Sequence, residues 1–175
     1  VYIEKPRKKF SNKRFINKDD LLKLISSKDV DTVIAAISGS DGLELILHSI
    51  LSGKKVLIAN KEPLVMAGEF IVNQAKKHGA QIIPIDSEHC SIHQSIQGKK
   101  ENSISKITLT CSGGPFYNLP KSDFKNISSK QALKHPIWKM GPKITIDSST
   151  LMNKALEIIE AKYLFREDPK KIEAI

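Results

Sequence analysis

Three short, mostly apolar segments recur along the first half of the chain, and a helix signal follows each of them. They are VDTVIAAI at 30–37, KVLIA at 55–59 and QIIPI at 81–85. Apolar runs of this length are typical of strands that are buried on both faces of a parallel sheet. The alternation of strand and helix with short connections predicts a doubly wound α/β sheet with right-handed crossovers.

Helices are expected before and between these strands. Residues 18–27 begin with acidic residues and carry leucines at helical spacing, residues 43–52 end before Gly53, and a third helix extends from Pro63 to Gly79. Proline suits the first turn of a helix, and glycine suits its C-terminal cap. We therefore expect residues 1–85 to be the second half of a Rossmann-like domain.

The spacing of the elements loosens near Asp86, where we expect a second domain to begin. Its expected elements are a helix at 88–97, strands at 104–111 and 143–146, and a helix at 151–165, with a region rich in Gly, Pro and Ser at 112–142. This mixture predicts an α+β domain over 86–175. Because the chain starts at Val1 without Met and ends inside an expected strand at 171–175, we expect an internal piece of a longer protein.

Composition excludes several classes of protein. The 175 residues are 40% hydrophobic and 27% charged, with only two cysteines, which excludes a disordered chain, a collagen and a disulfide scaffold. The net charge of +9 comes from lysines rather than arginines and without interleaved aromatic residues, which favours a solvated basic face over a nucleic-acid partner. No apolar run reaches the roughly 18 residues that cross a bilayer, so we expect a cytoplasmic protein without a membrane partner.

Polar side chains follow two of the expected strands, where open α/β sheets bind ligands. Asn60, Lys61 and Glu62 follow the second strand, and DSEH at 86–89 follows the third. Two carboxylates at i and i+2 repel each other unless a cation compensates, and such oxygen ligands suit Mg²⁺ or Mn²⁺. Simple helix starts, with Glu62 favoured by the helix dipole and Asp86 as an N-cap, are the alternatives.

His89 and His93 have the i, i+4 spacing of a zinc-binding helix. However, the sequence is EHCSIH rather than HExxH, and no third soft ligand lies nearby. We therefore interpret both residues as surface or hydrogen-bonding histidines.

A third polar cluster, DSST at 147–150, precedes a helix whose Asn153, Lys154 and Glu157 share one face. With Ser148, these residues provide hydroxyl, amide and ammonium donors beside the positive end of the helix dipole. Such a set suits a phosphate. A capped helix with a solvated Lys154–Glu157 pair is the alternative.

Two loops add further candidates. In SGGPF at 112–116, the glycines allow a ligand to approach the backbone and Ser112 provides a hydroxyl, which predicts an anion-binding turn. HPIWKMG at 135–141 holds the only tryptophan, and it is either buried or part of a mobile cover over a polar site. A GxGxxG fingerprint is absent from the sequence, so we expect any dinucleotide phosphate loop upstream of Val1.

Taken in order, ANKEPLV at 59–65, PIDSEH at 84–89, CSGGPF at 111–116, HPIWKMG at 135–141 and KITIDSSTLMNKALEIIEA at 143–161 resemble the 1-deoxy-D-xylulose 5-phosphate reductoisomerase family. The resemblance implies an oxidoreductase that uses NADPH and Mg²⁺ or Mn²⁺. The implied enzyme rearranges a sugar phosphate, 1-deoxy-D-xylulose 5-phosphate, and reduces the product to 2-C-methyl-D-erythritol 4-phosphate for isoprenoid biosynthesis. The resemblance also implies that residues 1–85 are part of an NADPH-binding Rossmann-like domain, and that residues 86–175 are a catalytic domain, incomplete at its C-terminus, that binds metal and substrate. The full-length enzyme is expected to be a homodimer.

The resemblance assigns roles residue by residue. It implies that the metal ligands are Asp86, Glu88 and Glu157, and that the catalytic residues are Lys61, Glu88 and His135. The residues expected beside NADPH are Asn60, Glu62, Met140 and Gly141. The expected substrate contacts are Lys61, Ser87, Glu88, Ser112, His135, Trp138, Ser148, Asn153, Lys154 and Glu157, among which Ser112, Ser148, Asn153 and Lys154 hold the phosphate.

Departures from the family pattern are neutral for this site. Pro63, Ile137, Ser149 and Ala155 replace residues that are common in the family, but none removes a charged or hydrogen-bonding group. Two alternatives are an inactive fragment that binds only metal or phosphate, and an oxidoreductase resembling homoserine dehydrogenase, in which ANK also follows a buried strand. The reaction of homoserine dehydrogenase needs no carboxylate cluster such as the one that DSEH and NKALE provide. A basic nucleic-acid binder is the third alternative.

Overall fold

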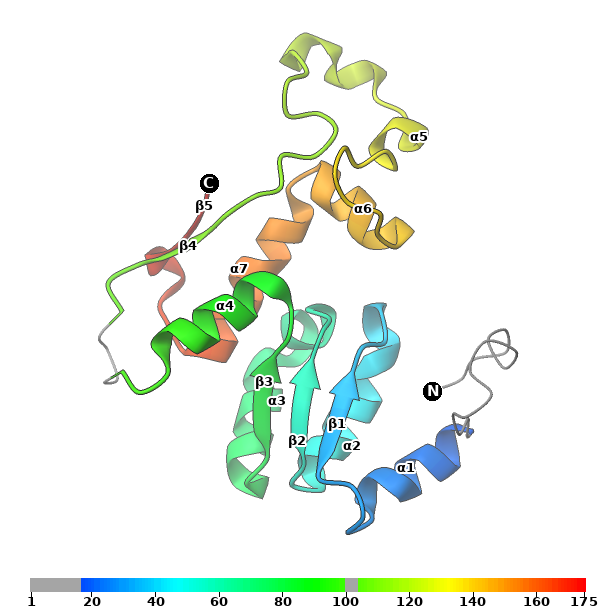
Figure 1. Ribbon diagram of the computed structural model, residues 1–175, viewed down its shortest axis with the longest axis vertical. Helices are drawn as coiled ribbons and strands as arrows, with labels where there is room; N and C mark the ends of the chain where they lie inside the picture. The colour runs from blue at the N-terminus through cyan, green and yellow to red at the C-terminus, as the bar shows by residue number, and fades with distance from the viewer. Residues whose placement is uncertain (1–16, 100–103) are drawn as a thin grey trace. The chain divides into compact units, whose positions relative to one another are not determined.

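The computed structural model describes residues 17–99 and 104–175, which divide into two compact units (Figure 1). The first unit ends at Asp86 and the second begins at Ser87. The expected domain boundary lies one residue earlier, and the separate roles expected for the two halves stay predictions. No helix within the two described ranges is long and apolar enough to span a membrane.

The first unit contains a three-stranded parallel sheet, as its apolar segments predict. Its strands β1 (Thr32–Ala35), β2 (Lys55–Ile58) and β3 (Gln81–Pro84) lie in the order β1-β2-β3. Val56 pairs with Val33 on one side and with Ile82 on the other. Val56 and Ile58 are fully buried, which explains why the central segment is apolar. The expected α/β fold is confirmed, although the strands are shorter than the apolar segments.

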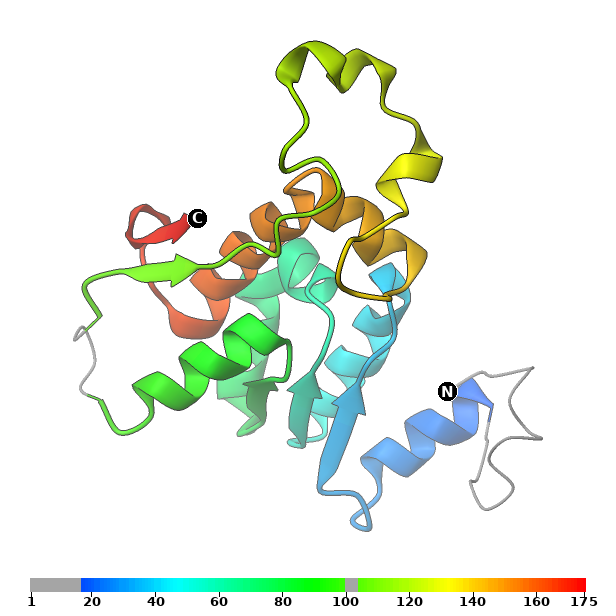
Figure 2. The same cartoon turned by 45° about the horizontal axis from the view of Figure 1, so that its top comes forward.

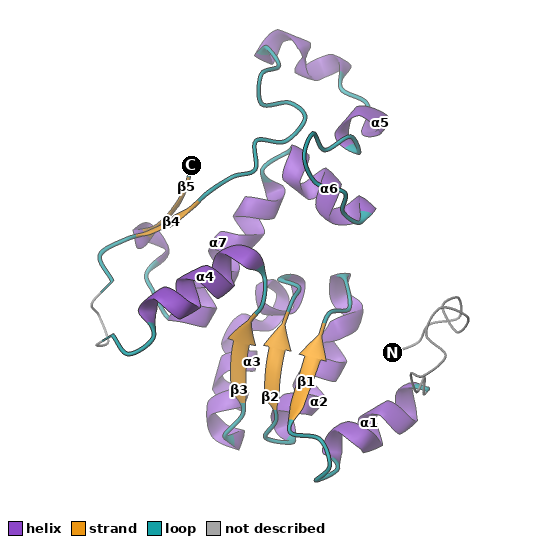
Figure 3. Cartoon of the chain, viewed as in Figure 1, coloured by secondary structure: helices purple, strands orange, loops and turns teal. Residues whose placement is uncertain are grey.

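Helices α2 (Leu43–Leu51) and α3 (Glu62–His78) connect these strands and cover one face of the sheet (Figure 3). Helix α1 (Lys18–Ser26) precedes β1, and the 3₁₀ turn η1 (Gly39–Gly42) lies between β1 and α2. Helices α2 and α3 pack together and bury Ile46, Ile50, Leu64 and Ile71 completely. The expected cap at the end of α3 is confirmed, because Gly79 has a φ of 67° and donates its backbone N–H to Ala75.

The second unit combines helices with a two-stranded parallel sheet. Its elements are α4 (Ser87–Ile96), β4 (Ile107–Leu109), η2 (Lys121–Asn126), α5 (Ser129–Ala132), α6 (Pro142–Ser149), α7 (Met152–Phe165), η3 (Pro169–Lys171) and β5 (Ile172–Ala174). Strand β4 pairs with β5, and Ala161 of α7 packs on both through Ile107, Leu109 and Ile172. The long segment between β4 and α6 carries η2 and α5 (Figure 2).

The strand expected at 143–146 is wrong, because these residues lie inside α6. Pro142 occupies the first turn of this helix, where proline is favoured. Lys143 and Asp147 form an ion pair of 2.6 Å one turn apart, and the Thr145 hydroxyl donates to the Gly141 carbonyl at 2.8 Å. Pro142 and these local contacts favour a helix over these residues. Asp147 is therefore a helical residue and does not follow a strand.

Candidate active site

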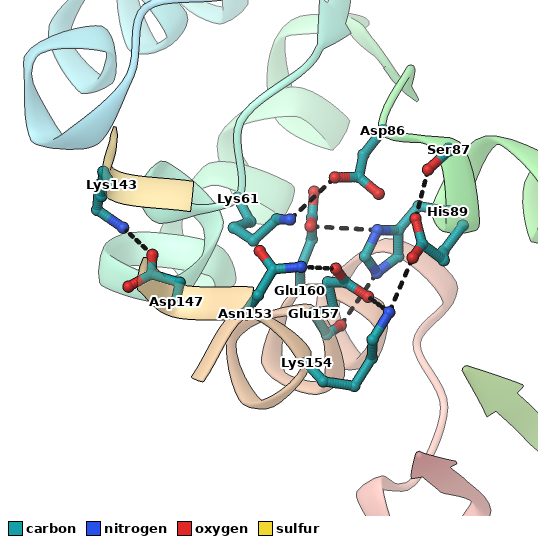
Figure 4. A network of polar contacts seen from close by, with 11 residues as sticks. Lys61, Asp86, Ser87, His89, Lys143, Asp147, Asn153, Lys154, Glu157 and Glu160 are labelled. Carbon is teal, nitrogen blue, oxygen red and sulfur yellow. Dashed lines mark hydrogen bonds and ion pairs between the residues drawn. The ribbon is translucent and has the colours of Figure 1, made fainter. Parts of the chain in front are cut away.

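In the first unit, the polar residues after β2 and β3 form a buried ion pair. The Nζ atom of Lys61 lies 2.9 Å from Oδ2 of Asp86, and their side chains are only 6% and 11% exposed (Figure 4). Lys61 precedes α3, and Asp86 follows β3 at the same edge of the parallel sheet. The sequence indicated both residues but not the pair. The pair fixes the direction of an ammonium group at this edge.

Asn60 and Glu62 flank Lys61 in different local environments. The Asn60 amide donates a long hydrogen bond of 3.5 Å to the Gly39 carbonyl in the turn after β1, while Glu62 opens α3. A Cβ atom at Gly42 would lie only 3.1 Å from the Ile37 carbonyl oxygen, so this turn favours a glycine. The expected contacts of Asn60 and Glu62 with NADPH stay predictions.

In the second unit, Lys154 lies between two carboxylates (Figure 4). Its Nζ atom is 2.8 Å from Oε1 of Glu88 on α4 and 2.6 Å from Oε2 of Glu157 on α7. Glu157 is fully buried, and its other oxygen accepts a hydrogen bond from the Asn153 amide. The expected common face of Asn153, Lys154 and Glu157 is confirmed, but Lys154 is buried rather than solvated.

Two opposing effects act on the pKa of Lys154. Burial lowers the pKa of this ammonium, but the hydrogen bonds to Glu157 and Glu88 outweigh burial and leave the pKa above its ordinary value. Lys154 is therefore positively charged at neutral pH. This charge stabilises the two carboxylates that it contacts.

The carboxylates of the second unit have the chemistry of ligands for a hard divalent cation. Glu88 and Glu157 each offer one oxygen, and these two oxygens lie within 4.8 Å of each other. Asp86 directly precedes Ser87, the first residue of α4, so the chain itself holds a third carboxylate two positions from Glu88. Oxygen donors in such a set fit Mg²⁺ or Mn²⁺.

A small pocket beside Lys154 collects the four residues that were expected to hold a phosphate. It has a volume of about 40 Å³ and is lined by Glu88, Cys111, Ser112, Gly113, Ser148, Leu151, Asn153 and Lys154. Its donors come from the segment after β4, from α6 and from α7. Two hydroxyls, an amide and an ammonium at one pocket suit a small anion.

Glycine is required where the segment after β4 crosses α6. Gly114 has a φ of 57°, and a side chain at this position would lie 3.2 Å from the Ser148 carbonyl oxygen. The close approach brings Ser112 and Ser148 to the same pocket. The glycines in SGGPF therefore position serine side chains as well as shaping a turn.

His135 adds a donor to this pocket through Ser112. Its Nδ1 atom accepts hydrogen bonds from the backbone N–H groups of Ile137 at 3.2 Å and Trp138 at 2.9 Å. A neutral ring must then carry its hydrogen on Nε2, which lies 3.0 Å from the Ser112 hydroxyl oxygen. Ser112 accepts from His135 in this arrangement and can donate its own hydrogen to an anion.

Leu151 and Cys111 line the pocket although the sequence did not indicate them. Leu151 was expected to be the first residue of the helix at 151–165, but it precedes α7 with a φ of 63° and is 63% exposed. A leucine in the left-handed region is strained, and no local sequence pattern predicts it. Cys111 pairs its backbone with Ile175 next to β5, which only the fold reveals.

Comparison with known proteins yields one family over most of the chain. The profile of the 1-deoxy-D-xylulose 5-phosphate reductoisomerase C-terminal domain matches residues 82–165, and the profile of 1-deoxy-D-xylulose 5-phosphate reductoisomerase matches residues 3–68. The reductoisomerase of Clostridium perfringens strain 13 is 48% identical over 90% of this chain and 41% of its own length. That of Treponema denticola is 49% identical over 95% of this chain and 44% of its own length.

Solved structures give the same result. A crystal structure of DOX-P reductoisomerase in complex with NADPH, fosmidomycin and magnesium is 46% identical, with a TM-score of 0.82 over 90% of this chain and 41% of that chain. The enzyme from Zymomonas mobilis in complex with NADPH is 38% identical, with a TM-score of 0.79 over 89% of this chain and 40% of that chain. The chain thus spans about two fifths of the relatives that it matches.

The exposure of the only tryptophan gives a direct spectroscopic test. Trp138 is 60% exposed, so we expect its fluorescence to resemble that of a solvated indole and to be quenched efficiently by acrylamide. N-acetyltryptophanamide is the reference. A blue-shifted emission that acrylamide does not reach would show that the loop 135–141 is packed against the protein instead.

Proposed function

Because the chain belongs to the 1-deoxy-D-xylulose 5-phosphate reductoisomerase family, we propose that the full-length protein converts 1-deoxy-D-xylulose 5-phosphate into 2-C-methyl-D-erythritol 4-phosphate. The reaction is a rearrangement followed by reduction with NADPH, and it supplies isoprenoid precursors. One observation supports the proposal above all. Lys154 lies at the junction of a carboxylate pair and an anion pocket, so one small molecule with a phosphate at one end could reach both.

The phosphate end of the substrate would enter the pocket beside Lys154. Ser112, Ser148 and Asn153 offer hydrogen-bond donors there, and the Lys154 ammonium supplies the charge. His135 would orient the Ser112 hydroxyl, since its Nε2 hydrogen points to Ser112. Charge-assisted hydrogen bonds of this kind hold phosphates firmly and orient the rest of the substrate.

The metal ligands in this proposal are Asp86, Glu88 and Glu157. Two of them already present oxygens within 4.8 Å of each other, and one relative was solved with magnesium. A bound Mg²⁺ or Mn²⁺ would polarise the substrate carbonyl and stabilise the negative charge of the rearrangement. Ser87 donates a hydrogen bond to Glu88, which leaves the other Glu88 oxygen to the cation and to Lys154.

Lys61 and the loop 135–141 complete the proposed site. Asp86 holds the Lys61 ammonium, which would donate to an oxygen at the reactive end of the substrate. Trp138 would cover the substrate, and Asn60, Glu62, Met140 and Gly141 would lie beside NADPH. Relatives solved with NADPH support this cofactor.

The proposal applies to the full-length protein. Family membership leaves no support for the interpretation as a homoserine-dehydrogenase-like enzyme. We also propose that the full-length enzyme is a homodimer in the cytoplasm, which sedimentation and cell fractionation would test.

The decisive test of the function is consumption of NADPH by the full-length protein with 1-deoxy-D-xylulose 5-phosphate and Mn²⁺. Absence of consumption by a folded protein that binds NADPH would refute it.

Replacing Glu157 with Gln should remove the stabilising effect of divalent cations. Mn²⁺ bound by the folded state raises the melting temperature, and the Glu157→Gln variant loses a negatively charged ligand. We expect Mn²⁺ to raise the melting temperature of the parent enzyme and to change that of Glu157→Gln little. The Glu173→Gln variant, which alters a carboxylate of β5, is the control and should respond like the parent. An equal response in Glu157→Gln would exclude this residue as a ligand.

Replacing Lys154 with Met should weaken substrate binding more than NADPH binding. The loss of a buried, charge-assisted contact should lower kcat/KM for the sugar phosphate. The decrease should correspond to ~2–4 kcal/mol of lost transition-state stabilisation, measured by steady-state kinetics. The control is Lys162→Met on the same helix, where the lysine is exposed and lies over the Tyr163 ring. If Lys154→Met kept KM and kcat within about twofold, or roughly 0.4 kcal/mol, the assigned phosphate contact would be wrong.

A further inference from the structure

Two buried polar residues of the second unit have no part in the proposed reaction. His89 on α4 and Glu160 on α7 both have fully buried side chains. Charged side chains are almost never buried completely unless they are paired. In this unit, Nδ1 of His89 lies 3.2 Å from Oε2 of Glu160. This contact therefore links the two helices that carry Glu88 and Glu157.

The other contacts of His89 fix its ring in one orientation. Its Nε2 atom lies 3.0 Å from the backbone carbonyl oxygen of Glu157, and because a carbonyl only accepts, Nε2 must be the donor. The ring also stacks on Phe165, with centroids 6.1 Å apart and planes at 23°. Figure 4 shows the His89 ring between Glu157 and Glu160. Both nitrogens and one face of the ring thus lie against residues of α7.

The spacing of these residues ties the contacts to the carboxylate pair. His89 is adjacent to Glu88 in α4, and Glu160 lies three positions after Glu157 in α7. A movement of the His89 ring would therefore shift the first turn of α4 relative to the turn of α7 that bears Glu157. Apolar side chains of similar volume could fill this space at no greater cost, so packing alone does not account for the pair.

We propose that His89 and Glu160 are positioning residues that hold Glu88 and Glu157 in the geometry needed for one divalent cation. The inference rests on the proposed function, because it assigns these carboxylates to a metal. Outer residues that orient metal ligands commonly change metal affinity 10- to 100-fold when they are replaced. Glu160 orients His89, and His89 holds the backbone of Glu157.

The test is a Mn²⁺ titration of the full-length enzyme, followed by the electron paramagnetic resonance signal of free Mn²⁺. We expect Glu160→Gln to raise the Kd for Mn²⁺ about 10- to 100-fold while the Kd for NADPH stays within about twofold. The matched control is Glu167→Gln, which removes another largely buried carboxylate of this unit that pairs with Lys171. Its Kd for Mn²⁺ should equal that of the parent.

A second pair of variants keeps the proposal testable if Glu160→Gln does not fold. The amide of His89→Gln can still donate to the Glu157 carbonyl, whereas His89→Leu cannot. We expect His89→Gln to bind Mn²⁺ more tightly than His89→Leu, with similar melting temperatures in the absence of metal. Equal Mn²⁺ affinity in these two variants, or parental affinity in Glu160→Gln, would overturn the inference.

The proposed function can be separated from this inference in the same experiment. If the parent binds Mn²⁺ and Glu157→Gln does not, the metal site stands, and unchanged affinity in Glu160→Gln then overturns only the positioning role. A parent that binds no Mn²⁺ would contradict both the metal site and the positioning role. Equal losses of Mn²⁺ and NADPH affinity in Glu160→Gln would indicate a general structural defect and would also overturn the inference.

Discussion

The second unit depends on one buried cation, the ammonium of Lys154 between Glu88 and Glu157. A buried carboxylate loses its hydration at a cost of several kcal/mol, and a nearby positive charge with good geometry can recover that cost. Glu157 has no exposed surface, so its contact with Lys154 at 2.6 Å offsets the cost of burying this carboxylate in α7. Lys154 also contacts Glu88, so α4 and α7 share one ammonium group.

The apolar side of α7 explains why the charges are presented together. Ala161 is fully buried against β4 and β5, and Ile158 and Phe165 pack on the same cluster. This packing orients the helix, so Lys154, Glu157 and Glu160 follow one another at intervals of three residues toward α4. Hydrophobic burial thus fixes the helix, and the polar stripe that remains carries the chemistry.

Lys154 also joins two subsites that serve opposite charges. The carboxylates have the charge and the oxygen atoms that suit a metal cation, while the pocket of Ser112, Ser148 and Asn153 offers hydrogen-bond donors that suit an anion. Placing both within reach of a single lysine suits a small substrate whose phosphate and reacting oxygens are only a few bonds apart. The proposed reaction needs this proximity, because binding the remote phosphate positions the carbons that rearrange.

The sequence predicted the parallel sheet, because strands buried on both faces require continuous apolar segments. It also predicted the end of α3, because a left-handed cap favours a glycine such as Gly79. It failed at KITI, because a segment of four residues cannot distinguish a strand from a helix, and in the structure Lys143 and Asp147 pair one turn apart along α6. The site residues were indicated by the motifs, but their pairing was not. Contacts such as Lys61–Asp86 and His89–Glu160 join elements far apart in the chain, so only the fold reveals them.

The central claim, that Lys154 and Glu157 form one buried charge unit, is tested most directly by a double-mutant cycle on the free energy of unfolding. Lys154→Met leaves the buried Glu157 without its lysine and should cost ~3–5 kcal/mol, measured by urea denaturation. Adding Glu157→Gln removes the negative charge that Lys154 no longer balances. The account predicts that the double variant is more stable than Lys154→Met alone. A double variant that is less stable, with the two single effects simply adding, would contradict the account.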